Sequence, residues 1–188
     1  MKLQGKAINV ALLEESDVEQ LLRLEVNNKD YFQQFTALRQ PSFYTYEGQW
    51  ERVHTALDMI AQDKGYFFLI RLNGGSEQVI GEVILTEVMR HNLQSCWIGY
   101  VLDQAHGGKG YMTEAVKLVV DYAFKELDLH RIEAGVMPHN IPSMQVLLKA
   151  GFHKEGIARK NVKINNRWED HQTLAIVREE PEEVAEHG

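Results

Sequence analysis

Apolar positions follow two different periods along this chain, and the changes between them divide the sequence into helices and strands. Apolar residues recur at helical spacing in four segments, residues 15–28, 46–62, 112–127 and 141–150. Shorter runs rich in β-branched and aromatic residues predict strands at residues 6–13, 66–72, 78–88, 95–102, 131–137, 151–164 and 167–177. This order predicts an α/β domain of the mixed, α+β kind, with helices flanking a mostly antiparallel twisted sheet.

Turn-forming residues indicate which strands pair. The segment "NGGSE" at residues 73–77 predicts a hairpin turn, and Asn165–Asn166 predicts a second one because asparagine tolerates positive φ. The strand–loop–helix–strand unit over residues 95–137 is the candidate for a parallel crossover. We therefore expect strands 95–102 and 131–137 to lie side by side.

Several helix ends also have a recognisable pattern. Ser16 and Glu19 have the spacing of a capping box at the start of the first helix. Asn140 is suited to be the N-cap of the helix at 141–150, and Gly151 to follow its C-terminus. In the helix at 46–62 we expect one buried face, formed by Trp50, Val53, Leu57 and Ile60.

Length and charge set limits on the architecture and the partners. The 188 residues fit one domain over residues 1–177 followed by an acidic tail, residues 178–188, which we expect to be disordered and solubilising. The net charge is −7, of which the tail carries −4, so a general nucleic-acid-binding surface is not expected. An acidic protein can attract a cationic substrate, although solubility alone also explains such a charge.

The amino-acid content gives no indication of secretion, a membrane or a metal. Cys96 is the only cysteine, which excludes a disulfide framework and suits a reducing cytoplasm. The N-terminus lacks the pattern of a signal peptide, and no apolar run approaches the roughly 18 residues of a membrane span. Six histidines lack metal-ligand spacing, so no metal site is expected: His91, His106, His130, His139, His153 and His171.

A glycine-rich loop, "QAHGGKGYMTEAV" at residues 104–116, precedes the helix at 112–127. It is no P-loop, because Lys109 is followed by Gly110 and not by a hydroxyl residue, and it lacks the G-x-G-x-x-G of a dinucleotide fold. It could be a plain turn. It could also present free backbone N–H groups to a phosphate at the helix N-terminus. Those groups would belong to Gly108, Lys109, Gly110, Tyr111, Met112 and Thr113.

A second segment, "MPHNIPSMQVLLKAGFHKEG", follows about thirty residues later. Together the two segments resemble the GCN5-related N-acetyltransferases (GNAT), over a match from about residue 8 to 177. The segments "HRIEAGVMPHN" and "NNRWEDH" are similar to the RimJ/RimL branch, which acetylates the N-termini of ribosomal proteins. The resemblance implies a sheet with a splayed central parallel strand pair and acetyl-CoA as cosubstrate.

The resemblance also implies how acetyl-CoA would be held. In the family's R/Q-x-x-G-x-G/A motif, Gly107 takes the R/Q position and Met112 the last one, so the Met112 side chain must point into the core. Backbone groups of Val101 and Leu102 would pair with the pantetheine arm, and one freed N–H would polarise the thioester carbonyl. Asn140 would bond the pantetheine or an ordered water.

The acceptor amine must be neutral when it attacks. An α-amine, with a pKa of about 7.7–8.0, needs a weaker base than lysine, with a pKa of about 10.4. Cys96 stands where histone-type members keep a glutamate, which favours an α-amine. Glu82 and Glu87 are the candidate bases, although each could be a plain carboxylate on an exposed strand face. Asp170 could orient a loop or the substrate.

The leaving thiolate needs a proton. Ser143, one helical turn after Asn140, is the candidate donor, directly or through water, and otherwise only a helix-terminal residue. A covalent route through Cys96 is disfavoured, because no base neighbours it in the sequence. His106 and His139 could flank the cofactor.

An aromatic cluster precedes the helix at 46–62, in the region that lines the family's acceptor groove: Tyr31, Phe32, Phe35, Phe43, Tyr44 and Tyr46. Core packing explains most of these residues, and we expect one or two to face the substrate. The leading hypothesis is thus a cytoplasmic N-acetyltransferase, monomer or homodimer, that acts by direct attack in a ternary complex on a protein N-terminus. The alternatives are a small-molecule amine acetyltransferase and a non-catalytic CoA-binding module.

Overall fold

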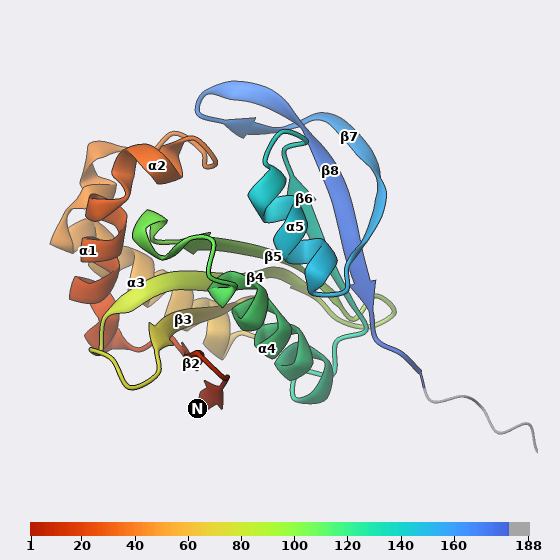
Figure 1. The fold of residues 1–188 in the computed structure, drawn as a ribbon, viewed down its shortest axis with the longest axis horizontal. Helices are drawn as coiled ribbons and strands as arrows, with labels where there is room; N and C mark the ends of the chain where they lie inside the picture. Colours follow the sequence, from red (N-terminus) through yellow and green to blue (C-terminus); the bar gives the residue numbers. More distant parts are fainter. Residues whose placement is uncertain (181–188) are drawn as a thin grey trace, which may run out of the picture.

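The computed structural model describes residues 1–180, which fold around one eight-stranded sheet (Figure 1). The strands are β1 (Lys2–Gln4), β2 (Ile8–Leu12), β3 (Tyr66–Leu72), β4 (Val79–Met89), β5 (Ser95–Leu102), β6 (Arg131–Val136), β7 (His153–Ile164) and β8 (Arg167–Val177). The α-helices are α1 (Val18–Asn27), α2 (Lys29–Gln33), α3 (Tyr46–Ala61), α4 (Tyr111–Lys125) and α5 (Ile141–Lys149). Short 3₁₀ turns lie at η1 (Glu15–Asp17), η2 (Pro41–Tyr44) and η3 (Gln104–His106). The predicted tail lies mostly outside the described residues.

The sheet has the order β1-β2-β3-β4-β5-β6-β8-β7, and β5 with β6 is its parallel pair. The other neighbouring strands run antiparallel. The predicted fold class is therefore confirmed, including the crossover from β5 through α4 to β6. No helix within residues 1–180 has both the length and the apolarity that a membrane crossing requires.

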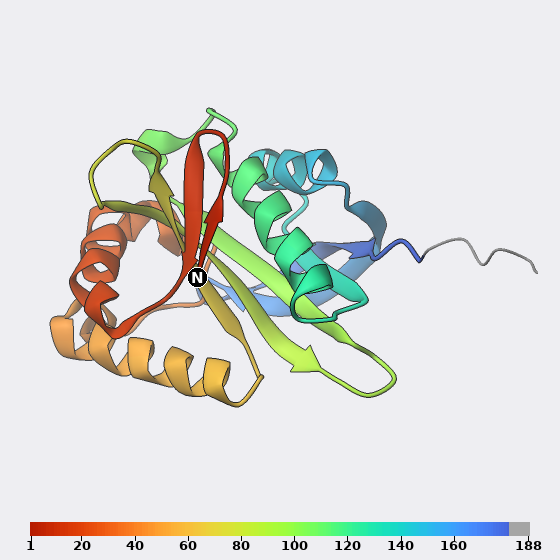
Figure 2. The ribbon, with the colours of Figure 1, turned by 90° about the horizontal axis from the view of Figure 1, so that it is seen from below.

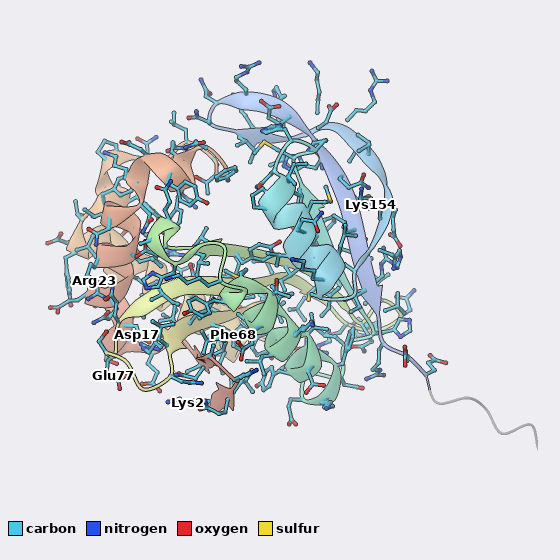
Figure 3. All side chains as sticks on the ribbon, in the orientation of Figure 1. Lys2, Asp17, Arg23, Phe68, Glu77 and Lys154 are labelled. Atoms are coloured by element: carbon cyan, nitrogen blue, oxygen red, sulfur yellow. The ribbon has the colours of Figure 1, made fainter. Side chains whose placement is uncertain are left out.

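The sheet buries both of its faces, as the alternation along β3 shows. Phe68 and Ile70 pack in the larger core with α4, and the Phe68 ring lies 5.6 Å from that of Tyr122 on α4. Phe67 and Leu69 point the other way, into a smaller core with α1 and α3. Figure 2 shows α1 and α3 together on one side of the strands and α4 on the other. In Figure 3 Phe68 lies inside the molecule, whereas Lys154 lies on the outside of β7.

Two local predictions are wrong. The capping box is not formed by Ser16 and Glu19, because the Asp17 carboxylate accepts from the Glu14 N–H at 2.8 Å. Arg71 of β3 holds the same carboxylate at 2.6 Å, a contact that no local pattern reveals. Trp50 does not share the buried face of α3, since it is 43% exposed and stacks on the His54 ring.

Several short elements were not predicted from the sequence. Strand β1 is three residues long, and it pairs only with β2, to which a tight turn at Gly5 connects it. Helix α2 and turn η2 are also too short for a periodic signal. They nevertheless carry the aromatic segment across the end of α1, where Phe32 becomes part of the smaller core. Tertiary packing, and not local preference, gives this segment its shape.

Candidate active site

The parallel pair opens soon after it begins. β5 pairs with β6 over Ser95–Trp97 and Arg131–Glu133 only, while β5 stays paired with β4 as far as Leu102. Beyond Trp97 one edge of β5 therefore has no neighbouring strand. This is the splay that the family resemblance implied.

Strand alternation determines which backbone groups face that opening. The Asp103 N–H donates to the Ile80 carbonyl of β4 at 2.8 Å, so alternate residues, including Val101, also turn their backbone groups to β4. The groups of Tyr100 and Leu102 then point into the opening. The Leu102 N–H is therefore free of β4, and its role toward a cofactor stays a prediction, whereas the backbone amide of Val101 faces β4; Val101 lines the cavity described below.

The glycine loop forms the N-terminus of α4. Gly110 is its N-cap at φ 81° and Gly108 has φ 75°, both in the left-handed region that glycine adopts readily. The first backbone bond of the helix runs from the Glu114 N–H to the Gly110 carbonyl. Among the described residues, no acceptor within hydrogen-bonding distance meets the N–H groups of residues 108–113. The expected set of free amides is therefore present, Thr113 included.

Gly107 does not belong to that set. Its N–H donates to the Gln104 carbonyl at 3.3 Å and so closes turn η3. A Cβ placed on Gly108 or Gly110 would meet no atom within 4 Å, so the space above the amides is open. Lys109 is exposed, while the Met112 side chain is only 5% exposed and points into the core as expected. The residues present thus fit a pyrophosphate lying on the helix N-terminus.

The loop is tied to the end of helix α1. The Asn28 side chain accepts from the Gln104 N–H at 3.0 Å and donates to the Leu24 carbonyl at 3.0 Å. Asp103 caps the short turn η3 by accepting from the Ala105 N–H. These bonds fix the start of the loop and leave its glycine part free.

The N-terminus of α5 carries the predicted proton donor. The Asn140 side chain caps the helix by accepting from the Ser143 N–H at 3.4 Å. The Tyr100 Oη lies 2.8 Å from the Ser143 Oγ and 3.0 Å from the Ser143 carbonyl oxygen, so its one proton can be donated to either. Burial raises the pKa of Tyr100 to about 12, so this residue keeps its proton at neutral pH. No pattern in the sequence indicated a role for Tyr100.

One cavity of about 260 Å³ lies beside the splayed part of β5 and the start of α5, and none of residues 102–113 belongs to its lining. Asn140, Ser143 and Tyr100 line one part of its wall, and Glu82 with residues of α1 and α3 lines another. Phe32 and Phe35 are the members of the aromatic cluster in this lining, whereas Tyr31, Phe43, Tyr44 and Tyr46 are not part of it. The cavity therefore joins the splayed strands to the region where an acceptor was expected.

The two candidate bases have different surroundings. Glu82 is 3% exposed, lines the cavity and pairs with Arg52 of α3. Glu87 is exposed, lies at an irregularity of β4 with φ 51°, and is not part of the cavity lining. The structure thus brings Glu82 to the site and leaves Glu87 outside it.

A further carboxylate, that of Glu25, was missed. Its Oε1 lies 3.4 Å from the Arg52 Nη1, so Arg52 bridges Glu25 and Glu82. Burial raises the pKa of Glu25, although Arg52 acts in the opposite direction. Burial would lower the pKa of Arg52, but the two carboxylates outweigh it and the pKa is raised. The sequence pattern could have indicated its burial, because Glu25 lies at helical spacing from the apolar residues Val18 and Leu21 on the buried face of α1.

The remaining candidates have structural surroundings. Asp170 accepts from the Lys160 N–H at 2.8 Å and shapes the β7–β8 hairpin, while the next residue, His171, lines the cavity. Cys96 is 1% exposed, and burial raises its pKa to about 12, which leaves a thiol and not a thiolate. A covalent route through Cys96 is therefore unsupported.

The two histidines that were predicted to flank the cofactor have different surroundings. His106 lies beside the loop, with its buried Nδ1 3.7 Å from Asp103 and without a hydrogen-bond partner, whereas His139 is exposed. Within residues 1–180, no three His, Cys, Asp or Glu side chains are grouped so that they could hold a metal ion.

Comparison with known proteins gives this arrangement a family. Residues 8–153 match the family model described as an acetyltransferase (GNAT) domain. The chain is 55% identical to Probable N-acetyltransferase YjcK of Bacillus subtilis, over 96% of this chain and 99% of that protein.

Solved structures agree. The ribosomal-protein-S5-alanine acetyltransferase from Vibrio fischeri superposes with a TM-score of 0.90 at 29% identity, covering 96% of this chain and all of that one. Mycobacterium smegmatis RimJ, solved in complex with CoA-disulfide, superposes with a TM-score of 0.84 at 25% identity, covering 90% of this chain and 81% of that one. The chain therefore belongs to the GNAT family and is an N-acetyltransferase.

Proposed function

We propose that this enzyme transfers the acetyl group of acetyl-CoA to the α-amine of a protein N-terminus, with a ribosomal protein as the acceptor, by direct attack in a ternary complex. The observation that carries the proposal is one cavity that extends from the splayed β5–β6 strands to the carboxylates of Glu25 and Glu82. The named activity of the Vibrio fischeri protein supports the acceptor class. The proposed location is the cytoplasm, where ribosomes would be met.

The cofactor end would act almost wholly through the backbone. The amides of residues 108–113 would hold the pyrophosphate, and the Leu102 N–H would bond the pantetheine arm or polarise the thioester carbonyl. Asn140 would bond the same arm or an ordered water. Acetyl-CoA supplies an activated acyl group, so the protein needs only to orient it and to stabilise the developing oxyanion.

The Ser143–Tyr100 pair would supply the proton for the leaving thiolate. Ser143 lines the cavity and shares a 2.8 Å contact with Tyr100, whose raised pKa keeps it protonated. A proton given up by Ser143 can be replaced from Tyr100 within the same hydrogen bond. The serine is then both a helix-terminal residue and part of the chemistry.

An α-amine fits the acceptor end better than a lysine amine does. Roughly 10–20% of an α-amine is neutral at pH 7, against well under about 0.1% of a lysine amine. The two carboxylates that line the cavity, Glu25 and Glu82, are both paired to Arg52, so neither is an isolated strong base. A small-molecule amine is the remaining alternative acceptor, and membership of the N-acetyltransferases leaves a non-catalytic binding module without support.

A thiol-release assay at fixed acetyl-CoA tests the acceptor. The panel contains peptides with free N-termini that copy ribosomal proteins, the same peptides N-acetylated but carrying a lysine, and small amines. We expect turnover with the free N-termini and at least about tenfold less with the other two groups. A preference for small amines would contradict the proposed acceptor, and turnover with none of the amines would contradict the proposed transfer.

A further inference from the structure

Three charged side chains from three different elements meet at the acceptor end of the cavity. Glu25 comes from α1, Arg52 from α3 and Glu82 from β4, and all three line the cavity. Glu25 is 6% exposed and Glu82 3%. Arg39 also lines the cavity, so the two carboxylates face two guanidinium groups, of which Arg52 is the one that pairs with both.

Stability alone does not explain such a cluster. Burying ions costs desolvation energy, and well-packed apolar residues often serve stability equally well. Arg52 is nevertheless fixed on several sides: its Nη1 donates to the Gln49 Oε1 at 3.2 Å, and its guanidinium lies over the Phe43 ring at 5.6 Å. The fully buried Gln49 in turn donates to the Phe43 carbonyl at 2.7 Å. The arginine is held rigidly where two acids can share it.

The two acids are held unequally. Glu82 makes the shorter contact with Arg52 through its Oε2, whereas the Oε1 of Glu25 stays 3.4 Å away. Among residues 1–180, the second oxygen of Glu25 has no hydrogen-bond donor. Since Glu25 also lines the cavity, this oxygen is the one available to a group entering it.

We propose that Glu25 takes the proton that the acceptor amine must lose, and that Arg52 and Glu82 act as the positioning pair that holds it. The inference rests on the proposed acetyl transfer. The acceptor ammonium gives one proton to Glu25, and from there it passes to solvent. The neutral nitrogen forms the C–N bond as the C–S bond breaks. The second proton of the nitrogen replaces the one that Ser143 and Tyr100 give to the thiolate.

The charged surroundings allow this role at neutral pH. Five charged or titratable groups surround Glu25. They are Arg52 of α3, Glu82 of β4, Arg39 of the segment before η2, Tyr44 of η2 and His171 of β8. Burial, the largest influence, and Glu82 raise the pKa of Glu25, while Arg52 and Arg39 lower it. A glutamate with a raised pKa is a better proton acceptor for an amine than an ordinary exposed one.

The test is Glu25→Gln, with Glu19→Gln as the matched control on the exposed side of the same helix. At pH 6 to 7 we expect Glu25→Gln to lower kcat/KM for a peptide acceptor about 100-fold, because general bases contribute on the order of 10² or more. The loss should shrink as the pH passes the α-amine pKa of about 7.7–8.0, where the acceptor deprotonates unaided. CoA affinity should not change, and the control should match the wild type.

Two results would overturn the proposal: a Glu25→Gln enzyme with wild-type kcat/KM, or a loss that is the same at every pH. If Glu25→Gln does not fold, Glu25→Asp keeps a carboxylate and should retain the wild-type shape of the pH profile at a lower rate; a pH-independent loss there would also contradict the role. A wild type that acetylates no amine contradicts the proposed function itself. The wild-type reaction therefore separates the two failures.

Discussion

The cofactor end and the acceptor end of the proposed site are built in different ways. The cofactor end consists of backbone groups, the amides of residues 108–113 and the free edge of β5, all within about twenty residues of sequence. The acceptor end consists of side chains, Glu25, Arg52 and Glu82, brought together from α1, α3 and β4. The cofactor end is formed by one short segment of the chain, whereas the acceptor end forms only when three distant segments pack together.

This difference determines what substitutions can do. A backbone amide survives most side-chain changes, so the cofactor end is sensitive mainly to residues that block the amides or alter the loop conformation. The acceptor end depends on two carboxylates that share one arginine, so replacing Arg52 leaves both of them unpaired. Acceptor choice can therefore vary among proteins that share one cofactor site.

The largest effect is expected from blocking the amides. Gly110→Leu puts a side chain into the open space over the loop and into a φ of 81°, so CoA affinity should fall about 100-fold or more, as measured by calorimetry. Gly74→Leu is the control, because Gly74 has φ 65° and open space around it but lies in the β3–β4 turn. Equal CoA affinity in both variants would show that the loop is only a turn.

Removing the shared cation should affect stability first. Arg52→Met leaves two buried carboxylates without a partner, and the free energy of unfolding should fall by about 3 kcal/mol at pH 7, as measured by urea denaturation. The loss should diminish as the pH falls, because protonation neutralises the unpaired acids. Arg23→Met on α1 is the control. A fully stable Arg52→Met protein would mean that the cluster is not electrostatically coupled.

The proton-donor pair should show a moderate effect on turnover only. Ser143→Ala and Tyr100→Phe should each lower kcat about tenfold, with CoA affinity unchanged, because each breaks the 2.8 Å contact. If the two residues act as one unit, the double variant should be no slower than the slower single variant. Independent, multiplying losses would contradict a shared proton path.

The smallest effect concerns the cost of keeping Glu25 charged. Folding raises the pKa of Glu25, so the native state binds this proton more tightly than the unfolded state does. The free energy of unfolding of the wild type should therefore fall as the pH rises from the ordinary pKa of glutamate through the raised pKa of Glu25. Glu25→Gln lacks this decline, and its melting temperature at pH 7 should equal or exceed that of the wild type. A clearly lower melting temperature would mean that the charge stabilises the fold.

The sequence predicts the local end of the site better than the distributed one. The glycine loop and the Asn140–Ser143 helix start were recognisable because a few adjacent residues create the feature. Gly107 could not be excluded beforehand from the phosphate-binding residues, because its N–H donates to the Gln104 carbonyl in a turn that forms only in the folded loop. The family resemblance supplied the function of the loop, which the glycines alone did not.

Glu25 and Tyr100 illustrate what local patterns cannot give. Glu25 is visible as an acid on an apolar stripe, yet its partner Arg52 stands 27 residues further along. Tyr100 bonds a residue 43 positions away. The same limit explains the wrong capping box, because the Asp17 carboxylate is positioned in part by Arg71. Long-range partners decide these roles.

The Asn28 side chain has a consequence for how the binding of one substrate affects the binding of the other. It bonds the Gln104 N–H at the start of the cofactor loop, and it ends the helix that carries Glu25 less than one turn earlier. A helix is stiff over one turn, so a shift of the loop when CoA arrives would be transmitted to the proton acceptor. We expect the two substrates to influence each other's affinity through this one amide, and Asn28→Ala to uncouple them while each still binds.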